Sequence, residues 1–173
     1  MSPRLIPVAH SDNSLLFEIY VSSRAEELKL APWTEDQKLA FLESQFEAQT
    51  NHYYSSYPNG SFDLIKLEDQ TAGRLFQAEL DDEIRIIDIT LLPQFRSCGI
   101  GTLLLSNILE TGKNKQKPVR IYLETYNRSQ TLFTRLGFIP VADDGVYCLW
   151  EKTPEEKNRT SEGLAVSVVN KTG

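Results

Sequence analysis

The sequence predicts a single α/β domain built on a mixed sheet, and three observations support this. The chain has 173 residues, and a domain usually has about 100–200 residues. Leu, Ile, Val and Phe make up more than a quarter of the chain, whereas in disordered chains they usually fall below roughly 20%. Helical and strand-like apolar patterns also follow one another along the chain. We expect residues 1–152 to form the domain and residues 153–173 a C-terminal tail.

The N-terminal part is predicted to contain one short strand and two helices. Residues 4–9 form the strand and residues 13–30 the first helix, which ends before Pro32 because proline restricts the preceding residue and cannot continue a helix. Thr34 is well placed to cap the second helix. Residues 55–61, which contain a Pro-Asn-Gly sequence, end that helix.

Three strands are predicted next. Residues 62–68 and 73–80 flank a turn over residues 69–72 and form a hairpin. Residues 83–92 form a longer strand whose alternation of apolar residues slips after Ile86. Such a slip indicates either a strand that is buried on both faces or a β-bulge.

The C-terminal half is predicted to add two helices and three strands. In chain order these are a helix over residues 100–111 that ends at Gly112, a strand over 119–126, a helix over 129–136 followed by Gly137, and a hairpin of residues 138–142 and 146–151. Beyond it, residues 164–169 are apolar enough to pair as a strand, although chain termini are usually poorly ordered. Both interpretations of the tail stay open.

Charge and cysteine content exclude several classes of protein. The net charge is −6, whereas a nucleic-acid-binding domain typically carries a basic patch and a pI above about 9. We therefore expect no nucleic-acid partner, and an acidic protein suits a cationic or amine partner. Cys98 and Cys148 form neither a disulfide framework nor a metal motif, so no metal is expected. The sequence has neither a signal peptide nor an apolar stretch of membrane-spanning length. This predicts a cytoplasmic protein that does not bind membranes.

One strand–loop–helix segment carries the clearest chemical signal. Gly99 and Gly101 allow a ligand to approach the backbone closely, and the first N–H groups of the following helix have no partner within it. These groups lie at the positive end of the helix dipole, so the segment is suited to a phosphate or pyrophosphate. Glycines that serve only tight packing at a helix start would give the same pattern. The segment contains Leu91, Leu92, Arg96, Ser97, Cys98, Gly99, Ile100, Gly101 and Thr102.

Two motifs in this chain resemble those of the GNAT family of N-acetyltransferases. The first is [Gln/Arg]-x-x-Gly-x-[Gly/Ala], which matches residues 96–101 and has Pro93 upstream. The second is an Asn followed ten residues later by Gly-Phe, which matches Asn127 and Gly137-Phe138. The resemblance covers residues 4–152, and residues 88–93 are similar to a bacterial subgroup whose substrates are largely unassigned. It implies the GNAT fold, with a central mixed twisted sheet of six to seven strands and four helices.

The resemblance also implies an activity and a cofactor. Acetyl-CoA is expected between two parallel strands that splay apart, and its pyrophosphate is expected on the backbone N–H groups of residues 98–102. Arg96 helps to position the pantetheine or the phosphates, and Asn127 contacts the cofactor arm. The N–H of about Leu91 is expected to polarise the thioester carbonyl. A primary amine of a small molecule or peptide then attacks directly, and the protein is a monomer or a homodimer.

The chain departs from the family pattern at one position that bears on catalysis. Many members place a Tyr four residues before the Gly of Gly-Phe, as general acid for the leaving thiolate. Phe133 occupies that position here. The resemblance implies that it contacts the cofactor, but a phenylalanine cannot donate a proton. A water, Thr134, Tyr126 or Tyr147 are the substitutes considered. The loss also favours an alternative, a catalytically weak or inactive acyl-CoA-binding module, and a structural protein that only kept the fold is a third interpretation.

The remaining candidates line the expected acceptor side. Asp88, Glu83 and Glu124 are the candidate bases, each with a surface or salt-bridged carboxylate as its alternative interpretation. Tyr126 completes the set of expected catalytic residues. His52, Tyr53 and Tyr57, near the end of the second helix, are expected to line the acceptor site, and an exposed helix end with tyrosines packed on the core is the alternative. Nothing in the sequence identifies the acceptor.

Overall fold

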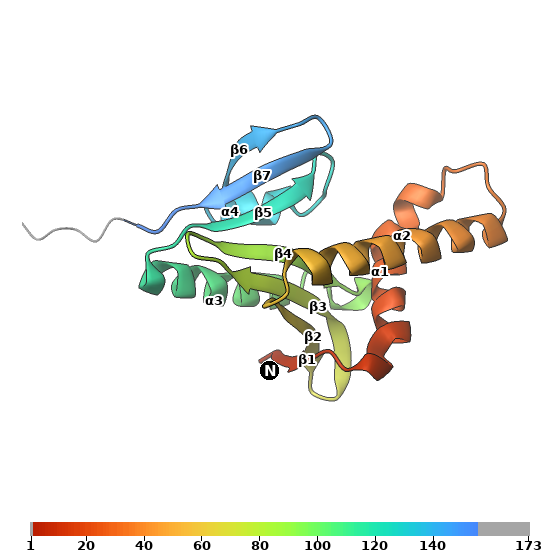
Figure 1. The fold of residues 1–173 in the computed structure, drawn as a ribbon, viewed down its shortest axis with the longest axis horizontal. Helices are drawn as coiled ribbons and strands as arrows, with labels where there is room; N and C mark the ends of the chain where they lie inside the picture. Colours follow the sequence, from red (N-terminus) through yellow and green to blue (C-terminus); the bar gives the residue numbers. More distant parts are fainter. Residues whose placement is uncertain (1, 156–173) are drawn as a thin grey trace, which may run out of the picture.

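A computed structural model describes residues 2–155 of the chain, and in this range seven strands form one sheet in the order β1-β2-β3-β4-β5-β7-β6 (Figure 1). The strands are β1 (Arg4–Pro7), β2 (Ser61–Leu67), β3 (Gln70–Glu79), β4 (Ile84–Leu91), β5 (Val119–Glu124), β6 (Ile139–Asp143) and β7 (Tyr147–Lys152). The helices are α1 (Asn13–Leu28), α2 (Glu35–Ser56), α3 (Ile100–Lys115) and α4 (Gln130–Arg135), with 3-10 turns η1 (His10–Asp12) and η2 (Pro93–Phe95). The predicted mixed α/β sheet with four helices is confirmed.

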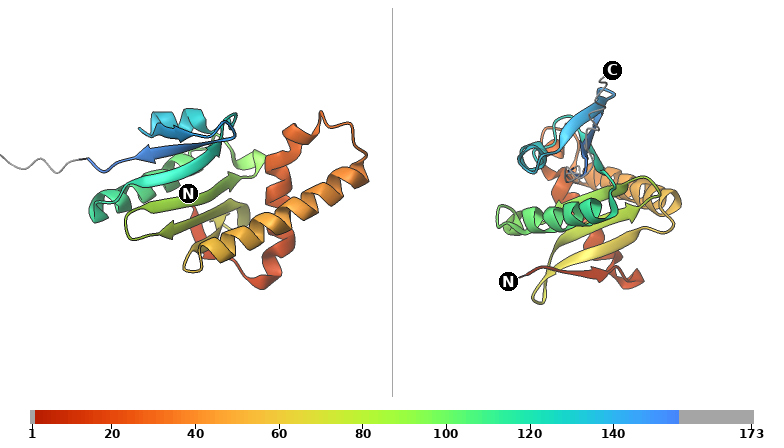
Figure 2. Two further views of the ribbon diagram at one scale, coloured as in Figure 1. Left: turned by 45° about the horizontal axis from the view of Figure 1, so that its top comes forward. Right: turned by 90° about the vertical axis from the view of Figure 1, so that its left-hand side faces the viewer.

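Helices cover the two faces of the sheet unequally. α1 and α2 lie on one face of β2–β4 and α3 lies on the other (Figure 2). One core cluster joins α1 and α2 to the sheet through residues such as Leu16, Ile19 and Phe46. The second cluster joins α3 and α4 to the other face through residues such as Leu105 and Phe133. The face of β5 and β7 that continues the α2 side carries exposed side chains instead.

The two central strands are parallel and pair over only a short length. β4 and β5 share three residue pairs, from Ile84↔Val119 to Ile86↔Ile121. β4 then continues to Leu91 and β5 to Glu124 without further pairing between them, and the strands diverge (Figure 1). We call this unpaired stretch the β4–β5 splay.

A β-bulge lies where the splay begins. Gln77 of β3 pairs with Ile86 and Phe76 pairs with Asp88, so Ile87 is an extra residue in β4. The slip in apolar alternation after Ile86 is thus explained by the bulge, which was one of its two predicted causes. A bulge bends its strand and increases its twist, which turns the second half of β4 away from β5.

The structure corrects several predicted boundaries. The hairpin turn after β2 is shorter than residues 69–72, because Glu68 takes a left-handed conformation with φ of 54° and β3 begins at Gln70. Gly112 does not end its helix: it is buried within α3, where a Cβ would lie 2.9 Å from the Lys117 oxygen, and Gln116 caps the helix. The first helix ends at Leu28, and residues 164–169 lie outside the described part of the chain.

The predicted cap of α2 is confirmed by its hydrogen bonds. The Thr34 hydroxyl accepts from the Gln37 N–H at 3.2 Å, and the Gln37 side chain accepts from the Thr34 N–H at 3.0 Å. This reciprocal arrangement satisfies two backbone donors that a helix start otherwise leaves free. Among the helices within residues 2–155, none is both long and apolar enough to span a membrane.

Candidate functional site

The loop between β4 and α3 leaves free backbone donors at the mouth of the splay. Gly99 is the N-cap of α3 with φ of 83°, and the first bond within the helix runs from the Leu103 N–H to the Gly99 oxygen at 3.0 Å. The N–H groups of residues 100–102 therefore have no partner inside the helix. A Cβ at Gly99 would meet no atom within 4 Å. The helix start is open to a ligand, and its charge favours an anion.

Arg96 and Arg135 lie beside this helix start, and Arg128 lies near Arg96. Arg96 donates from Nε to the Leu91 oxygen at 2.9 Å, which holds the loop against the end of β4. Arg135 of α4 reaches the Thr102 hydroxyl at 3.5 Å. Burial and then the nearby charge of Arg128 lower the pKa of Arg96. Within residues 2–155 none of the three forms an ion pair with a carboxylate, although the Glu26 carboxylate is near enough to Arg96 to raise its pKa slightly in return.

Arg128 and Arg135 are not among the residues to which the motifs point. Both lie inside the segment from Asn127 to Gly137 that forms the second motif, and only the folded chain brings Arg135 beside α3 and Arg128 near Arg96. The Asn127 side-chain oxygen accepts from the Ser129 N–H at 2.9 Å, so it orders the loop between β5 and α4. Sequence offers one signal for these arginines, namely their position in the loop and short helix that follow a central parallel strand.

The second half of β4 presents backbone N–H groups to the splay. The Leu92 N–H donates to the Ala72 oxygen on the β3 side at 2.8 Å. Since successive residues of a strand direct their N–H groups to opposite edges, those of Ile89 and Leu91 face β5. Leu92 itself is buried against α1 and α2. Of the two leucines expected at the cofactor, Leu91 has its N–H toward the splay.

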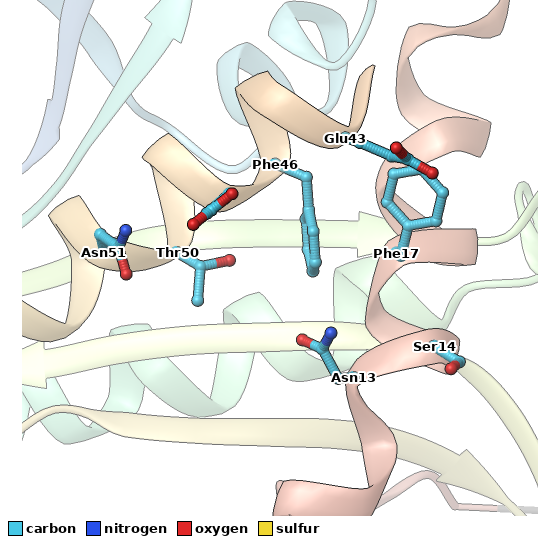
Figure 3. Close-up of a pocket in the computed structure, with 8 residues that line it drawn as sticks. Asn13, Ser14, Phe17, Glu43, Phe46, Thr50 and Asn51 are labelled. Carbon is cyan, nitrogen blue, oxygen red and sulfur yellow. The ribbon is translucent and has the colours of Figure 1, made fainter. Parts of the chain in front are cut away.

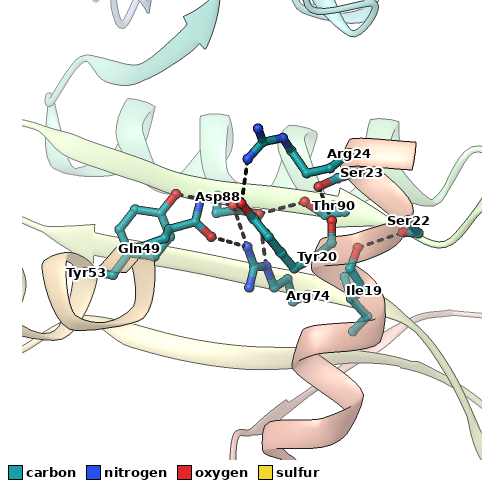
Figure 4. Close-up of polar contacts among 10 residues, drawn as sticks. All are labelled: Ile19, Tyr20, Ser22, Ser23, Arg24, Gln49, Tyr53, Arg74, Asp88 and Thr90. Atoms are coloured by element: carbon teal, nitrogen blue, oxygen red, sulfur yellow. Dashed lines mark hydrogen bonds and ion pairs between the residues drawn. The ribbon is translucent and has the colours of Figure 1, made fainter. Parts of the chain in front are cut away.

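Asp88 lies in a buried polar network on the α2 face (Figure 4). Its Oδ2 accepts from Arg74 Nη2 at 2.9 Å and from the Tyr53 hydroxyl at 3.3 Å. Its Oδ1 accepts from Thr90 Oγ1 at 2.7 Å and from Arg74 Nε at 3.3 Å. Arg74 also donates to Gln49 Oε1 at 2.9 Å. Both oxygens of Asp88, one of the three candidate bases, therefore already accept hydrogen bonds.

Glu83 is engaged in a different ion-pair network. It is buried, immediately before Ile84, at the end where β4 and β5 are paired. Its carboxylate lies 2.8 Å from Arg85 Nη2 and 3.7 Å from Arg120 Nη1. Arg120 in turn pairs with Glu151 of β7 at 2.6 Å. Through these arginines, Glu83 therefore connects β4 and β5 at the end where the two strands are still paired.

Unlike Asp88 and Glu83, Glu124 has no ion-pair partner in the described part of the chain. It is the last residue of β5, it is exposed, and it forms no ion pair within the described part of the chain. Tyr147 of β7 lies directly opposite it in the ladder, so the two side chains share one face of the sheet. Tyr122, two residues earlier, shares that face. Tyr126 follows β5 and is 96% exposed.

The end of α2 approaches the same region, although its three candidates differ in environment. Tyr53 is held by Asp88, and burial followed by that negative charge raises the pKa of Tyr53 far above its usual value. Tyr57 accepts from Arg85 Nη1 at 3.2 Å. His52 is exposed and lies 3.4 Å from the Ser56 hydroxyl. The structure thus places Tyr53 and Tyr57 against β4, and His52 toward solvent.

Phe133 occupies the core beneath this site. Its side chain is fully buried and its ring meets that of Phe138 edge-on, with centroids 5.1 Å apart. α4 therefore uses this position for packing between the sheet and α3. A tyrosine there would need a partner for a buried hydroxyl.

A hollow between α1 and α2 lies away from the splay. It has a volume of about 500 Å³, and residues of α1 and α2 alone line it, including Phe17, Phe46, Glu43 and Glu47 (Figure 3). None of the candidate residues lines it. Between residues 2 and 155 no cluster of three or more His, Cys, Asp or Glu side chains is suited to a metal ion.

Comparison with models of known protein families identifies one family for this chain. Residues 20–138 match the model described as the Acetyltransferase (GNAT) family. No curated protein sequence matches the chain.

Several solved structures share this fold. The PaiA N-acetyltransferase of Thermoplasma acidophilum, solved with coenzyme A, has a TM-score of 0.67 at 17% identity, covering 88% of this chain and 99% of that one. An acetyltransferase from Thermus thermophilus has a TM-score of 0.66 at 16% identity, with 88% and 97% covered. Ard1 from Thermoplasma volcanium has a TM-score of 0.60 at 15% identity, with 90% and 100% covered.

Proposed function

Since this chain belongs to the GNAT family of acetyltransferases, we propose that it transfers an acetyl group from acetyl-CoA to a primary amine of a small molecule or peptide. The observation that carries this proposal is the β4–β5 splay, which opens beside the free N-terminus of α3. One side of the splay suits an anionic cofactor, and the other presents carboxylates and tyrosines to an amine.

The residues around the α3 N-terminus fit the phosphates of coenzyme A. The N–H groups of residues 100–102 provide donors, and the open space over Gly99 leaves room for the pyrophosphate. Arg96, Arg128 and Arg135 provide positive charge, and none of them forms an ion pair with a described carboxylate. A net charge of −6 is compatible with so anionic a cofactor because these groups act locally.

The open edge of β4 is suited to hold the reacting carbonyl. Acetyl-CoA, when bound, supplies a thioester carbonyl carbon for the amine to attack. The N–H groups of Ile89 and Leu91 would donate to its oxygen and stabilise the negative charge that develops there. The bulge at Ile87 supports this role, because it turns that edge away from pairing with β5.

Glu124 is the carboxylate that we assign to proton removal. An ammonium group must lose a proton before its nitrogen can attack, and Glu124 can accept that proton directly or through a water. Asp88 and Glu83 are less suited because arginines already hold them. Tyr147, opposite Glu124, or a water would protonate the leaving thiolate in place of the tyrosine that Phe133 replaces.

Calorimetry with acetyl-CoA tests the cofactor half of the proposal. Gly99→Glu places a carboxylate at the helix start and should abolish binding. Gly145→Glu is the matched control, because Gly145 also has positive φ, 91° against 83°, and a Cβ there also meets no atom within 4 Å. Absence of binding by the unmodified protein at millimolar acetyl-CoA would contradict the proposal, and so would equal affinity in the two variants.

A second measurement separates the enzyme from a binding module. The absence of a tyrosine at Phe133 favours a module that binds acyl-CoA without catalysis. Release of free thiol from acetyl-CoA, measured across a broad panel of primary amines, should depend on the amine if the protein is an enzyme. Binding without amine-dependent thiol release would instead support the module.

A further inference from the structure

A buried ion pair joins three elements beside the splay. Arg74 of β3 and Asp88 of β4 have side chains only 3% and 14% exposed, and they are 2.9 Å apart. The guanidinium also stacks over the Phe76 ring at 4.9 Å from its centroid. Gln49 and Tyr53 of α2 complete the network, one bonded to each charge (Figure 4).

The hydrogen-bond acceptor positions of Asp88 are all occupied. This carboxylate is therefore not available to accept a proton from a substrate. The carboxylate accepts four hydrogen bonds, from Arg74 twice, from Tyr53 and from Thr90. A carboxylate has about four acceptor positions. A buried pair of this kind contributes little net stability unless its geometry is good, yet removal of one partner is strongly destabilising. The side chains of Arg74, Asp88, Gln49 and Tyr53 thus form a rigid connection between β3, β4 and α2, which we call the joint.

The joint connects the two halves of the proposed reaction. Asp88 directly follows the bulge residue Ile87, and the next residue, Ile89, has its N–H toward the splay. On the other side, Gln49 lies two turns and Tyr53 one turn before Tyr57, the C-cap of α2. The network thus ties the strand that would hold the thioester carbonyl to the helix expected to line the acceptor site.

We propose that Arg74 and Asp88, through Gln49 and Tyr53, form a positioning device that sets the distance between α2 and the open edge of β4. Its function is to hold the acceptor amine in line with the thioester. This inference rests on the proposed acetyl transfer. Orientation of two reactants accounts for a large share of many barriers, and a displacement of about 1 Å can cost roughly 100-fold in rate.

The test detaches α2 from the joint while leaving the ion pair in place. Gln49→Met removes the acceptor for Arg74, and Gln49→Glu is the matched variant that keeps one. Tyr53→Phe removes the other link to α2. Thr90→Val is its control, because it also removes a hydroxyl from Asp88 but one that lies within β4.

We expect Gln49→Met combined with Tyr53→Phe to lower kcat by roughly 10- to 100-fold and to raise KM for the amine. The affinity for coenzyme A, measured by calorimetry, should change less than about twofold, because the α3 side is untouched. Gln49→Glu should retain the activity of the unmodified protein, and Thr90→Val should lose less than the double variant. The amines are 1,4-diaminobutane, phenylalanine amide and a lysine-containing peptide.

Two results would overturn the inference alone. One is unchanged kcat in the double variant, and the other is a parallel loss of kcat and coenzyme A affinity, which a purely structural role predicts. If the unmodified protein transfers acetyl to none of these amines nor to any of a wider panel, the proposed function fails and this inference fails with it.

Discussion

The two sides of the β4–β5 splay are built by different means. On the α3 side the groups that we propose for cofactor binding are backbone N–H groups of one continuous segment, residues 100–102, with Arg96 and Arg135 nearby. On the α2 side the candidate groups are side chains from α2, β3, β4, β5 and β7, and the carboxylates of Asp88 and Glu83 are neutralised in ion pairs. The α3 side therefore depends on the backbone conformation of one segment and much less on its side chains. The α2 side depends on specific contacts between side chains from different elements.

The largest expected effect concerns the carboxylate that has no ion pair in the described structure. Glu124→Gln should lower kcat by about 10²–10⁴-fold, the usual contribution of a general base, and leave the affinity for coenzyme A unchanged. Glu110→Gln, at an exposed position of α3, is the control. Steady-state kinetics and calorimetry together check this. A matching loss of cofactor affinity would show that the two sides are not separable in this way.

The next effect concerns stability on the α2 side. Asp88→Ala leaves the buried Arg74 charge without its partner and should lower the free energy of unfolding by about 3–5 kcal/mol. Asp81→Ala changes an exposed carboxylate outside the described ion pairs, and surface changes of that kind usually stay within about 0.5 kcal/mol. Urea denaturation measures both. If the two variants are equally stable, the Arg74–Asp88 pair is not the joint that we describe.

Close backbone packing on the α3 side predicts a smaller loss. In Gly112→Ala the new Cβ would lie 2.9 Å from both the Lys117 oxygen and Val119 Cγ2. Such overpacking costs about 1–3 kcal/mol, although alanine favours the helix. In Gly101→Ala the new Cβ would meet only side-chain ends, Leu132 Cδ2 at 3.4 Å and Leu91 Cδ1 at 3.9 Å, and the variant should lose less. Thermal unfolding of the two variants ranks them, and the reverse order would contradict the packing argument.

The smallest expected effect belongs to the exposed arginines. Arg128→Gln and Arg135→Gln should each weaken coenzyme A binding by about 2- to 5-fold, as befits exposed charge pairs, and less at high salt. Arg4→Gln is the matched control, because Arg4 also has no ion pair in the described structure but lies on β1 at the far edge of the sheet. Calorimetry at two salt concentrations checks this. Equal effects of all three changes would indicate that net charge alone matters.

Much of the fold and one side of the site could be predicted because the signals are local. The α3 N-terminus, the Thr34 cap and the slip at Ile86 each depend on a few adjacent residues, and each was found where expected. Boundaries were less predictable. Gly112 has the pattern of a helix terminator, yet it lies inside α3 because the loop and β5 pack against it too closely for a side chain.

The other side of the site could not be predicted in the same way. Asp88, Glu83 and Glu124 are equivalent as sequence letters, and only the fold distinguishes them, by placing Arg74 beside the first and Arg85 beside the second. The nearest of these arginines along the chain is two residues from its partner, and the other is fourteen residues away on a neighbouring strand.

The sequence by itself determined the family, the mixed α/β class and the start of α3 after Gly99, because backbone conformation and helix termini follow from neighbouring residues. Tertiary structure alone decided which carboxylate is free of arginine partners among the described residues, that Phe133 is core, and that Arg135 lies beside α3. Whether a charged group is paired and whether a side chain is buried depend on contacts between residues far apart in the chain. Only the packing of the helices on the sheet sets those contacts.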